Sequence, residues 1–327
     1  MNSSAISEVC WVISDGRIGI VNQCLGLAGA VGLPIEVKTV HPRAPWTWLP
    51  ITMWPCPFRS LGPDSATFAP PWPRLIVACG WRSIPMVLAI KRLSGGATFT
   101  VQVQDPRIAL THFDLVVPPA HDLVAPGPNV ITTFGSPNRN TREELEAGAA
   151  LWGPRFEHLP RPRVGVLIGG TSKAHRFDER AAREFAARLK RLADDGVSLI
   201  VTPSRRTGEA QTRIISRALE GTNAFVWNGT GENPYFAILA LCDAFLVTSD
   251  STNLLSEAAS TGKPLHMIDI PGGNAKFDRL HAGLIERGIA RRFTGKIESW
   301  TYPQLDETAD VAAEIKRRMA AKAALKR

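Results

Sequence analysis

The sequence predicts an α/β protein with two doubly wound domains. Apolar runs of four to seven residues alternate with helix-length segments along most of the chain, which is typical of parallel strands covered by helices on both faces. The alternation stops at residues 152–163, "WGPRFEHLPRPR", whose prolines and arginines indicate a linker, and then begins again. The 327 residues suffice for two domains of about 150 residues each. We therefore predict domains at 1–155 and 156–295, followed by a helical tail at 296–327.

In the first half, strand-like runs lie at 9–14, 34–40, 74–79, 98–103 and 114–119. Helices are expected at 18–32, where Gly32 is the stop, and at 83–93. Residues 42–73 break the pattern with four tryptophans and many prolines, which exclude a regular helix or a central strand. This segment is either a loop folded over the first domain or an exposed apolar surface for a lipid-linked acceptor or a membrane interface.

In the second half, strands are expected at 164–170, 197–204, 223–228, 244–249 and 264–269. Helices are expected at 178–196, 210–221, 233–242 and 252–261. The first of these helices places Ala182, Phe185, Leu189 and Leu192 on one stripe. The series therefore predicts a second doubly wound, Rossmann-like domain.

Composition and charge exclude several classes of protein. Residues 315–327 contribute +6 of the net charge of +8, so the rest of the chain is nearly balanced and nucleic acid is not an expected partner. The basic tail is either a solvated helix or a segment attracted to an anionic membrane surface. Five scattered cysteines without paired spacing predict neither a disulfide framework nor a zinc site. The N-terminus shows no signal peptide pattern and no window resembles a spanning helix, so we expect a cytoplasmic protein.

Four loops at the expected carboxyl ends of strands carry the candidate site residues. The first is "SDGRIGIVNQ" at 14–23. Asp15 is its only carboxylate and a candidate general base, Gly16 allows a tight turn, and Arg17 would face a phosphate. Asn22 and Gln23 would orient a polar ligand. The alternative is that Asp15 caps the helix and Arg17 is solvated.

The second and third loops lie in the second domain. In "GGTSKAHRF" two glycines leave room for a phosphate and two hydroxyls can donate to it. His175 is either a phosphate-facing residue or an ordinary loop residue. In "TPSRRTGE" an arginine pair suits a diphosphate, although both arginines could simply be exposed. The nucleotide-binding candidates in these loops are Gly169, Gly170, Thr171, Ser172, Ser204, Arg205 and Arg206.

The fourth loop, in "AFLVTSDSTNLLSEAA", joins a buried strand to the helix at 252–261. Its hydroxyl and amide side chains lie beside the start of that helix, where an anion is favoured. Glu257 lies among apolar neighbours further along the helix and could accept both hydroxyls of a ribose. The nucleotide-binding candidates here are Ser249, Ser251, Thr252, Asn253 and Glu257.

Together, "SDGRIGIVNQCLGLA", "GGTSKAHRF", "TPSRRTG" and "TSDSTNLLSEAASTGKP" resemble the mitochondrial fission ELM-type family of glycosyltransferase-like proteins, over roughly residues 9–295. The resemblance implies a GT-B-like fold, in which two Rossmann-like domains face each other across a cleft. It implies that Glu257 binds ribose, that Ser251, Thr252 and Asn253 lie near the diphosphate, and that residues 169–172 line the cleft. Residues 15–17 would face the acceptor. The family is similar in fold to the enzyme that adds N-acetylglucosamine to lipid-linked peptidoglycan precursors, but that enzyme has a longer glycine run in this loop and a His where this chain has Asp15.

The leading hypothesis is a metal-independent glycosyltransferase that uses a nucleotide-sugar co-substrate and no cofactor, with an acceptor that is lipid-linked or of the cell envelope. No DxD-type ligand pair is present, and arginines and helix N-termini would stabilise the leaving diphosphate. The alternative is a non-enzymatic adaptor, because plant relatives are linked to mitochondrial division through a dynamin-like protein. A short-chain dehydrogenase type epimerase is disfavoured, since the first loop lacks GxGxxG and neither tyrosine has a Lys four residues later.

Overall fold

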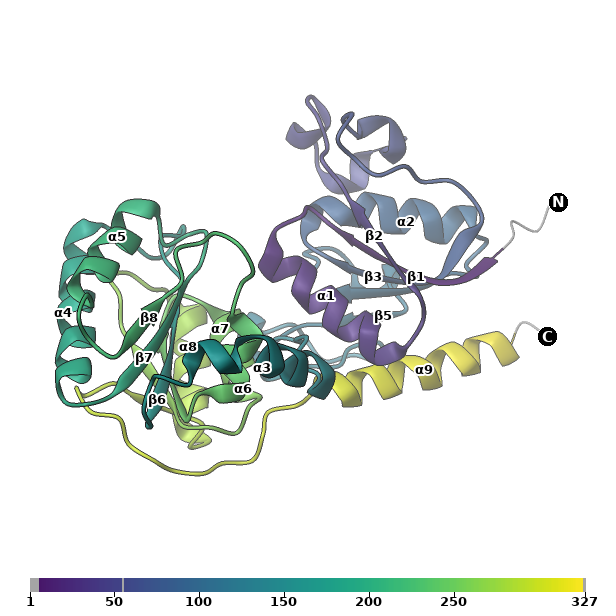
Figure 1. Ribbon diagram of the computed structural model, residues 1–327. Coiled ribbons are helices and arrows are strands. Elements are labelled where there is room, and N and C mark those ends of the chain that lie inside the picture. The colour runs from purple at the N-terminus through teal and green to yellow at the C-terminus, as the bar shows by residue number, and fades with distance from the viewer. Residues whose placement is uncertain (1–5, 55, 326–327) are drawn as a thin grey trace. The chain divides into compact units, whose positions relative to one another are not determined.

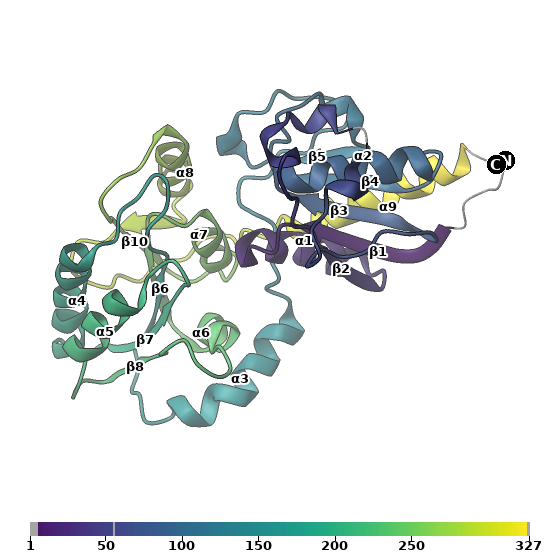
Figure 2. The ribbon, with the colours of Figure 1, turned by 90° about the horizontal axis from the view of Figure 1, so that it is seen from above.

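The computed structural model describes residues 6–54 and 56–325 and contains two parallel sheets, each in its own compact unit. The first domain comprises residues 1–139 and 306–327, and the second comprises residues 140–305. Helices cover both faces of each sheet (Figures 1 and 2). The predicted fold class, two Rossmann-like doubly wound domains, is confirmed.

The first sheet has the strand order β2-β1-β3-β4-β5. Its strands are β1 (Ile6–Ser14), β2 (Ile35–Thr39), β3 (Trp72–Cys79), β4 (Phe99–Val103) and β5 (Leu115–Val117). One face is covered by α1 (Ile18–Val31) and α9 (Thr308–Ala324), and the other by α2 (Ile84–Leu93). The strand order reverses between β1 and β3, so a ligand is expected at the carboxyl ends of these two strands.

The C-terminal helix is part of the first domain and not a separate tail. Four apolar side chains of α9 are buried against the sheet face that α1 also covers: Val311, Ala312, Ile315 and Met319. Residues 296–305 lie instead on the second domain, where the Tyr302 hydroxyl donates to the Lys263 carbonyl at 2.7 Å. The division therefore differs from the predicted boundary at 295/296, because the apolar stripe of α9 packs on the first sheet.

Three basic side chains of α9 have partners within the first domain. Arg317 and Arg318 both pair with Glu314, at 2.5 and 2.6 Å. Lys322 Nζ lies 2.8 Å from a carboxylate oxygen of Asp114. Lys326 and Arg327, which also belong to the predicted basic tail, lie outside the described residues. The described part of the tail is thus a docked helix, three of whose four cations are paired with carboxylates.

The connection between β2 and β3 ends at residue 71, not at the predicted residue 73, because Trp72 and Pro73 already belong to β3, a central strand that the proline at its second position does not prevent. We call residues 42–71 the insertion. Its regular structure is limited to the short 3₁₀ helices η1 (Trp46–Trp48), η2 (Ile51–Met53) and η3 (Pro57–Ser60). It lies on the same face of the sheet as α2 (Figure 1). Its prolines prevent longer helices.

The second sheet has the order β11-β10-β9-β6-β7-β8. Its strands are β6 (Arg163–Ile168), β7 (Ser198–Pro203), β8 (Ala224–Val226), β9 (Ala244–Thr248), β10 (Leu265–Ile268) and β11 (Ala290–Arg292). Counted from β6, this is the 3-2-1-4-5-6 order of dinucleotide-binding folds, with its reversal between β6 and β9. The loops after these two strands are therefore placed where such folds bind ligands.

The helices of the second domain include two that the sequence did not predict. The described helices of this domain are α3 (Arg142–Phe156), α4 (Glu179–Asp194), α5 (Glu209–Ala218), α6 (Tyr235–Leu241), α7 (Thr252–Ala259) and α8 (Ala275–Glu286). Helices α4 and α5 cover one face of the sheet, and α3 packs on α6. Of the unpredicted helices, α8 lies beyond the last predicted strand and α3 precedes β6.

Residues 152–163 are not an extended linker throughout, because α3 continues to Phe156. Trp152 and Phe156, spaced one helical turn apart, stack on each other and contact Phe225 edge-on. This packing holds α3 to the second domain, which begins at Asn140 and not at the predicted residue 156. The proline and arginines in this stretch suggested a linker, whereas the aromatic pair decides the packing.

The two glycines of α3 test this packing. A Cβ on Gly148 would lie 2.7 Å from the backbone nitrogen of Ala237, whereas one on Gly153 would meet nothing within 4 Å. We expect Gly148→Ala to lower the free energy of unfolding by about 2 kcal/mol. Gly153→Ala should change it by less than about 0.5 kcal/mol, because the gain in helix propensity is offset by crowding of the new Cβ against Pro154. Urea unfolding of both variants measures this. Equal effects would contradict the close packing of α3 on α6.

Candidate functional site

In the first domain, Asp15, Gly16 and Arg17 lie together in the loop between β1 and α1. The Arg17 guanidinium forms an ion pair with the Asp15 carboxylate. Arg17 Nε lies 3.1 Å from Oδ1 and 2.9 Å from Oδ2, and Nη2 lies 2.7 Å from Oδ2. The Asp15 side chain is 3% exposed and that of Arg17 is 64% exposed. Gly16 has φ +77°, which favours glycine. The cation of this pair is thus presented to solvent while the anion is covered.

Two opposing effects set the pKa of Asp15. Burial raises this pKa, but hydrogen bonds from Arg17 and the charges of Arg17 and Arg82 outweigh burial and hold the pKa below its ordinary value. Asp15 is therefore ionised at neutral pH. The N-cap position of α1 is Arg17, so Asp15 does not cap the helix in the sense of the alternative interpretation.

Asn22 and Gln23 lie on α1, beyond the Asp15 loop. Gln23 is buried, and its side-chain oxygen accepts a hydrogen bond from Gln104 Nε2 at 3.2 Å. Asn22 is half-buried. The structure therefore places Gln23 in contact with the segment after β4, and its predicted role toward an acceptor stays a prediction.

In the second domain, the loops after β6 and β9 meet at the point where the strand order reverses. The Gly169 amide donates to Thr248 Oγ1 at 2.8 Å, and the Gly170 amide donates to Asp250 Oδ2 at 2.8 Å. A Cβ on Gly169 would lie 2.2 Å from Asp250 Oδ2. The two glycines are therefore required for this close approach, in addition to any room they leave for a phosphate.

Asp250 is the central group of this junction. Its side chain is fully buried, and Oδ2 lies 2.8 Å from Arg206 Nη2. Arg206 Nη1 also donates to the Gly170 carbonyl at 3.3 Å. Asp250 Oδ1 is buried without a hydrogen-bond partner among the described residues. Arg206, predicted to face a diphosphate, is therefore already paired with Asp250. Arg205, the other member of the arginine pair, is exposed.

Hydroxyl groups tie the third loop to the second. Ser204 Oγ donates to the Gly169 carbonyl, and Thr207 Oγ1 donates to the same carbonyl at 2.7 Å. Thr171 Oγ1 accepts from the Phe177 amide and Ser172 Oγ accepts from the His175 amide. The hydroxyls of residues 171 and 172 thus fold back on their own loop, and each keeps a proton that it can donate outward.

The fourth loop leads into α7. Ser251 is the N-cap of this helix and accepts from the Leu254 amide at 3.4 Å. Thr252 and Asn253 form the first turn that follows. The Ser249 side chain accepts from the Ile270 amide, so it connects β9 to the loop after β10. The amide groups of the first turn of α7 provide partial positive charge beside the Gly169–Gly170 loop.

Glu257 is buried in α7, 7% exposed, and accepts a hydrogen bond from the Tyr235 hydroxyl of α6. Burial, and then the negative charge of Glu257, raise the pKa of Tyr235 well above its ordinary value, so this hydroxyl keeps its proton. Asn140 Nδ2 donates to the Glu257 carbonyl at 2.8 Å. Hydrogen bonds from Tyr235 and Asn140 therefore fix the position of Glu257. A carboxylate in a fixed position is suited to accept hydrogen bonds from a ligand.

The sequence did not single out Asp250, Tyr235 or Thr207 as candidate residues. Asp250 was visible as the only acid of its loop, and Tyr235 as one of two tyrosines in the chain. Their importance depends on partners distant in sequence: Gly170 for Asp250 and Glu257 for Tyr235. No local pattern indicates either pair.

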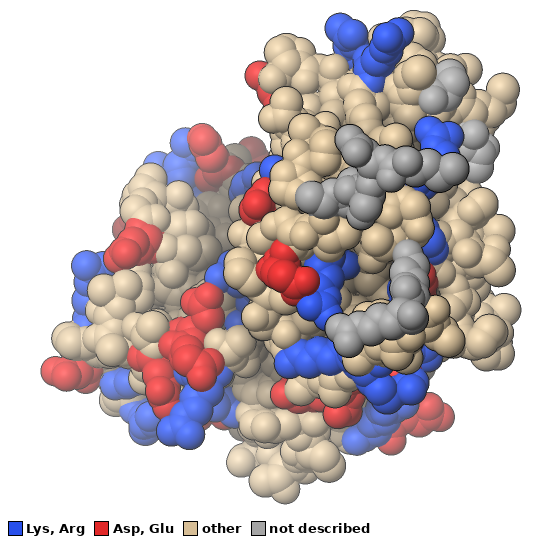
Figure 3. Space-filling model, turned by 90° about the vertical axis from the view of Figure 1, so that its right-hand side faces the viewer, with Lys and Arg blue, Asp and Glu red and all other residues tan. Residues whose placement is uncertain are grey.

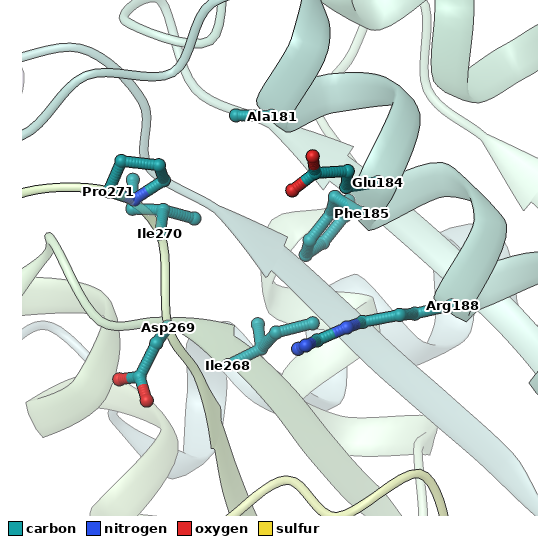
Figure 4. A pocket seen from close by; sticks show the side chains of 8 residues that line it. All are labelled: Ala181, Glu184, Phe185, Arg188, Ile268, Asp269, Ile270 and Pro271. Atoms are coloured by element: carbon teal, nitrogen blue, oxygen red, sulfur yellow. The ribbon is translucent and has the colours of Figure 1, made fainter.

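A small pocket lies on the α4 side of β10 and does not belong to the candidate site. Phe185 and Ile268 provide apolar walls, and Arg188 reaches from α4 toward Ile268 (Figure 4). Its volume of about 60 Å³ holds about two water molecules and is too small for a nucleotide.

Buried histidines of the second domain give it a distinctive response to pH. His175, His266 and His281 are buried, and burial is the main cause that lowers the pKa of each. His175 packs edge-on against Phe277, and His281 Nε2 lies 2.8 Å from the Ser249 carbonyl. These rings are therefore neutral in the folded protein at pH values where free histidine is protonated.

We expect the second domain to lose stability as the pH falls below about 6.5, because the unfolded chain binds protons there and the folded chain does not. The loss between pH 7.5 and 5.5 should be about 1 kcal/mol or more. Urea unfolding at both pH values measures it. His281→Gln should reduce the loss, whereas His158→Gln, at an exposed position, should leave it unchanged. A pH-independent free energy of unfolding would contradict the prediction.

Comparison with known proteins identifies the family. A family model described as mitochondrial fission ELM1 matches residues 18–319. The chain belongs to the mitochondrial fission ELM1 family. It is 33% identical over 282 residues to mitochondrial fission protein ELM1 of Arabidopsis thaliana, a match that covers 78% of this chain and 66% of that relative. It is 26% identical to the uncharacterized protein RP120 of Rickettsia prowazekii, covering 94% of this chain and 97% of the other.

Solved structures show where the ELM1 fold belongs. A variant of Os79 from O. sativa in complex with UDP matches with a TM-score of 0.53 at 13% identity, covering 95% of this chain and 94% of that one. The UDP-GlcNAc 2-epimerase from Neisseria meningitidis bound to UDP-GlcNAc matches with a TM-score of 0.50 at 11% identity, covering 95% and 100%. At such identities these likenesses concern the fold, which is of the GT-B type.

Proposed function

We propose that this protein is a glycosyltransferase that binds a nucleotide sugar in its second domain. The proposal rests on the junction at the strand reversal of the second sheet. There the Gly169–Gly170 loop contacts Asp250, which lies two residues before the first turn of α7. Glu257, a buried carboxylate, lies further along α7. Such a junction suits a diphosphate at the amides and a ribose at the carboxylate. That two solved structures of the same fold contain UDP or UDP-GlcNAc supports this choice of ligand.

In the proposed reaction, the bond between the anomeric carbon and the diphosphate oxygen breaks and a bond to an acceptor oxygen forms. The diphosphate leaves with the electron pair and is stabilised by amides of α7 and by Arg205, while Arg206 stays paired with Asp250. The proposal includes no metal ion and no resident cofactor. In this proposal the chain's own donors take the part that a metal ion plays in other transferases.

The acceptor side is assigned to the first domain. Arg17 is presented to solvent by its pairing with Asp15 and would bind a phosphate or carboxylate of the acceptor. Asp15 is the proposed base for the acceptor hydroxyl. Because Arg17 holds its pKa low, Asp15 would take the proton only as the new bond forms. A lipid-linked or envelope acceptor fits such a site.

A second candidate function is a non-enzymatic adaptor. The observation that favours it is internal pairing: Arg206 is bound to Asp250, and Glu257 to Tyr235. The name of the Arabidopsis relative also concerns mitochondrial fission. The match covers 66% of that relative, which therefore extends beyond the shared part, and its role need not reside there.

Calorimetric titration of the full chain with UDP, GDP and CMP separates the two functions. Micromolar binding of one nucleotide would support the transferase and name its donor class. The absence of binding by a folded protein would favour the adaptor. A further incubation with UDP-GlcNAc and no acceptor tests for epimerisation, since the fold alone does not distinguish epimerases from transferases.

A further inference from the structure

The insertion (residues 42–71) has a buried side that fixes it to the first domain. Trp54 is 5% exposed and belongs to the same apolar cluster as Trp11 and Ile76 of the sheet. Phe58 and Phe68 stack on each other and join this cluster. The insertion is thus folded over the first domain, as one of the two sequence interpretations predicts.

The insertion is also closed at its base. Pro42 and Leu61 form an antiparallel bridge, and the Gly62 amide donates to the His41 carbonyl at 3.0 Å. Within the loop, Trp54 Nε1 donates to the Leu49 carbonyl at 3.3 Å. These bonds order the outer part of the insertion. A partner that binds its side chains therefore does not have to order the loop, and little conformational entropy is lost on binding.

Three apolar side chains at the outer end remain in solvent. Trp48 is 79% exposed, Met53 is 62% exposed and Leu49 is 40% exposed. We call these three residues the tip. Single exposed apolar residues are common on protein surfaces, but three within six positions, including a tryptophan, require an explanation.

Basic side chains outnumber acidic ones in the insertion. Arg43 and Arg59 are exposed there, and its single acid, Asp64, is exposed as well. Figure 3 shows Lys and Arg side chains at the summit of a mainly uncharged upper surface, whereas lower on the same face basic and acidic side chains are interspersed. The tip is therefore an apolar group in a segment whose charge is mainly positive.

The size of the tip argues against a protein partner. A stable protein interface needs about 800 Å² from each partner, formed by some twenty residues, and three side chains do not supply this area. Partial insertion into a bilayer needs only a few apolar side chains with nearby cations, and tryptophan favours the level of the lipid head groups. No helix in the described part of the chain is long and apolar enough to cross a membrane.

We propose that the tip of the insertion inserts into the head-group region of an anionic bilayer, with Arg43 and Arg59 bound to lipid phosphates, and that this holds the protein at the membrane surface. The assignment does not depend on the proposed glycosyl transfer. It moves the membrane contact away from the C-terminal helix, whose described cations are mostly paired within the first domain.

Co-sedimentation of the full chain with vesicles tests the proposal. Vesicles of phosphatidylcholine alone are compared with vesicles that contain 30 mol% phosphatidylglycerol, at low and high salt. We expect binding to the anionic vesicles only, a loss of about tenfold or more in Trp48→Ser/Met53→Ser, and a loss of about fivefold in Arg59→Gln that disappears at high salt. Leu123→Asn is the matched control, since Leu123 is 68% exposed elsewhere in the first domain, and it should bind as wild type.

A second measurement reports insertion directly. Cys56 is exposed within the insertion, whereas the other cysteines are buried, so a polarity-sensitive dye attaches there selectively. Its emission should shift to shorter wavelength with anionic vesicles. Failure of the wild type to bind, or equal binding by the folded double variant, would overturn the proposal. A change of oligomeric state in the double variant without a change in vesicle binding would instead assign the tip to a second copy of the chain.

Discussion

Glu257→Gln should weaken binding of the preferred nucleoside diphosphate by about 10- to 100-fold while leaving the fold intact. A charged carboxylate that accepts from ribose hydroxyls contributes about 1.5–3 kcal/mol, which a neutral amide does not replace. Glu257 is 7% exposed and fixed by the Tyr235 hydroxyl, so little solvent screening reduces this contribution. Calorimetric titration with UDP, or with whichever nucleotide the wild type binds, measures the change.

Tyr235→Phe tests how Glu257 is held. Removal of the hydroxyl leaves the carboxylate without this donor, and we expect nucleotide affinity to fall by about three- to tenfold. Wild type should prefer UDP over 2′-deoxy-UDP, and both variants should lose this preference. Glu220→Gln, at an exposed position outside the helices, serves as the control. Unchanged affinity and preference in Glu257→Gln would exclude a ribose contact at this residue.

Asp250→Ala should lower the free energy of unfolding of the second domain by about 3 kcal/mol. The buried carboxylate accepts from the Gly170 amide and pairs with Arg206. Its removal leaves a buried amide without its acceptor and takes the counter-charge from a partly buried guanidinium. Asp250→Asn should cost less, about 1 kcal/mol, since an amide oxygen can still accept from Gly170. Chemical denaturation of the full chain measures both values.

Controls separate this network from surface charge. Asp195→Ala removes an exposed acid that follows α4, and its effect should stay within about 0.5 kcal/mol. A double-mutant cycle of Asp250→Ala with Arg206→Gln should give a coupling of about 1 kcal/mol, because Arg206 is 39% exposed and solvent screens part of the pair. Simple additivity of the two substitutions would show that the ion pair does not support the loop.

Several features of the site were predictable because they follow from local sequence. Gly169 and Gly170 were expected to leave room for a phosphate, which stays a prediction, whereas the structure shows this loop in close contact with Asp250 and Arg206. Hydroxyl and amide side chains were expected beside the start of α7, and the structure places Ser251 at its N-cap and Thr252 and Asn253 in its first turn. The arginine pair was also located correctly after β7, but the prediction could not show that Arg206 is neutralised from another loop.

The sequence by itself determined the fold class, most of the strands and helices, and which loops follow the strands, because apolar periodicity and turn residues act over a few positions. Only the tertiary structure decided which residues meet. Asp250 reaches Gly170 because β9 lies beside β6, and α9 returns to the first domain because its apolar stripe fits that sheet. Strand order and helix docking depend on contacts between distant segments, and no local pattern encodes them.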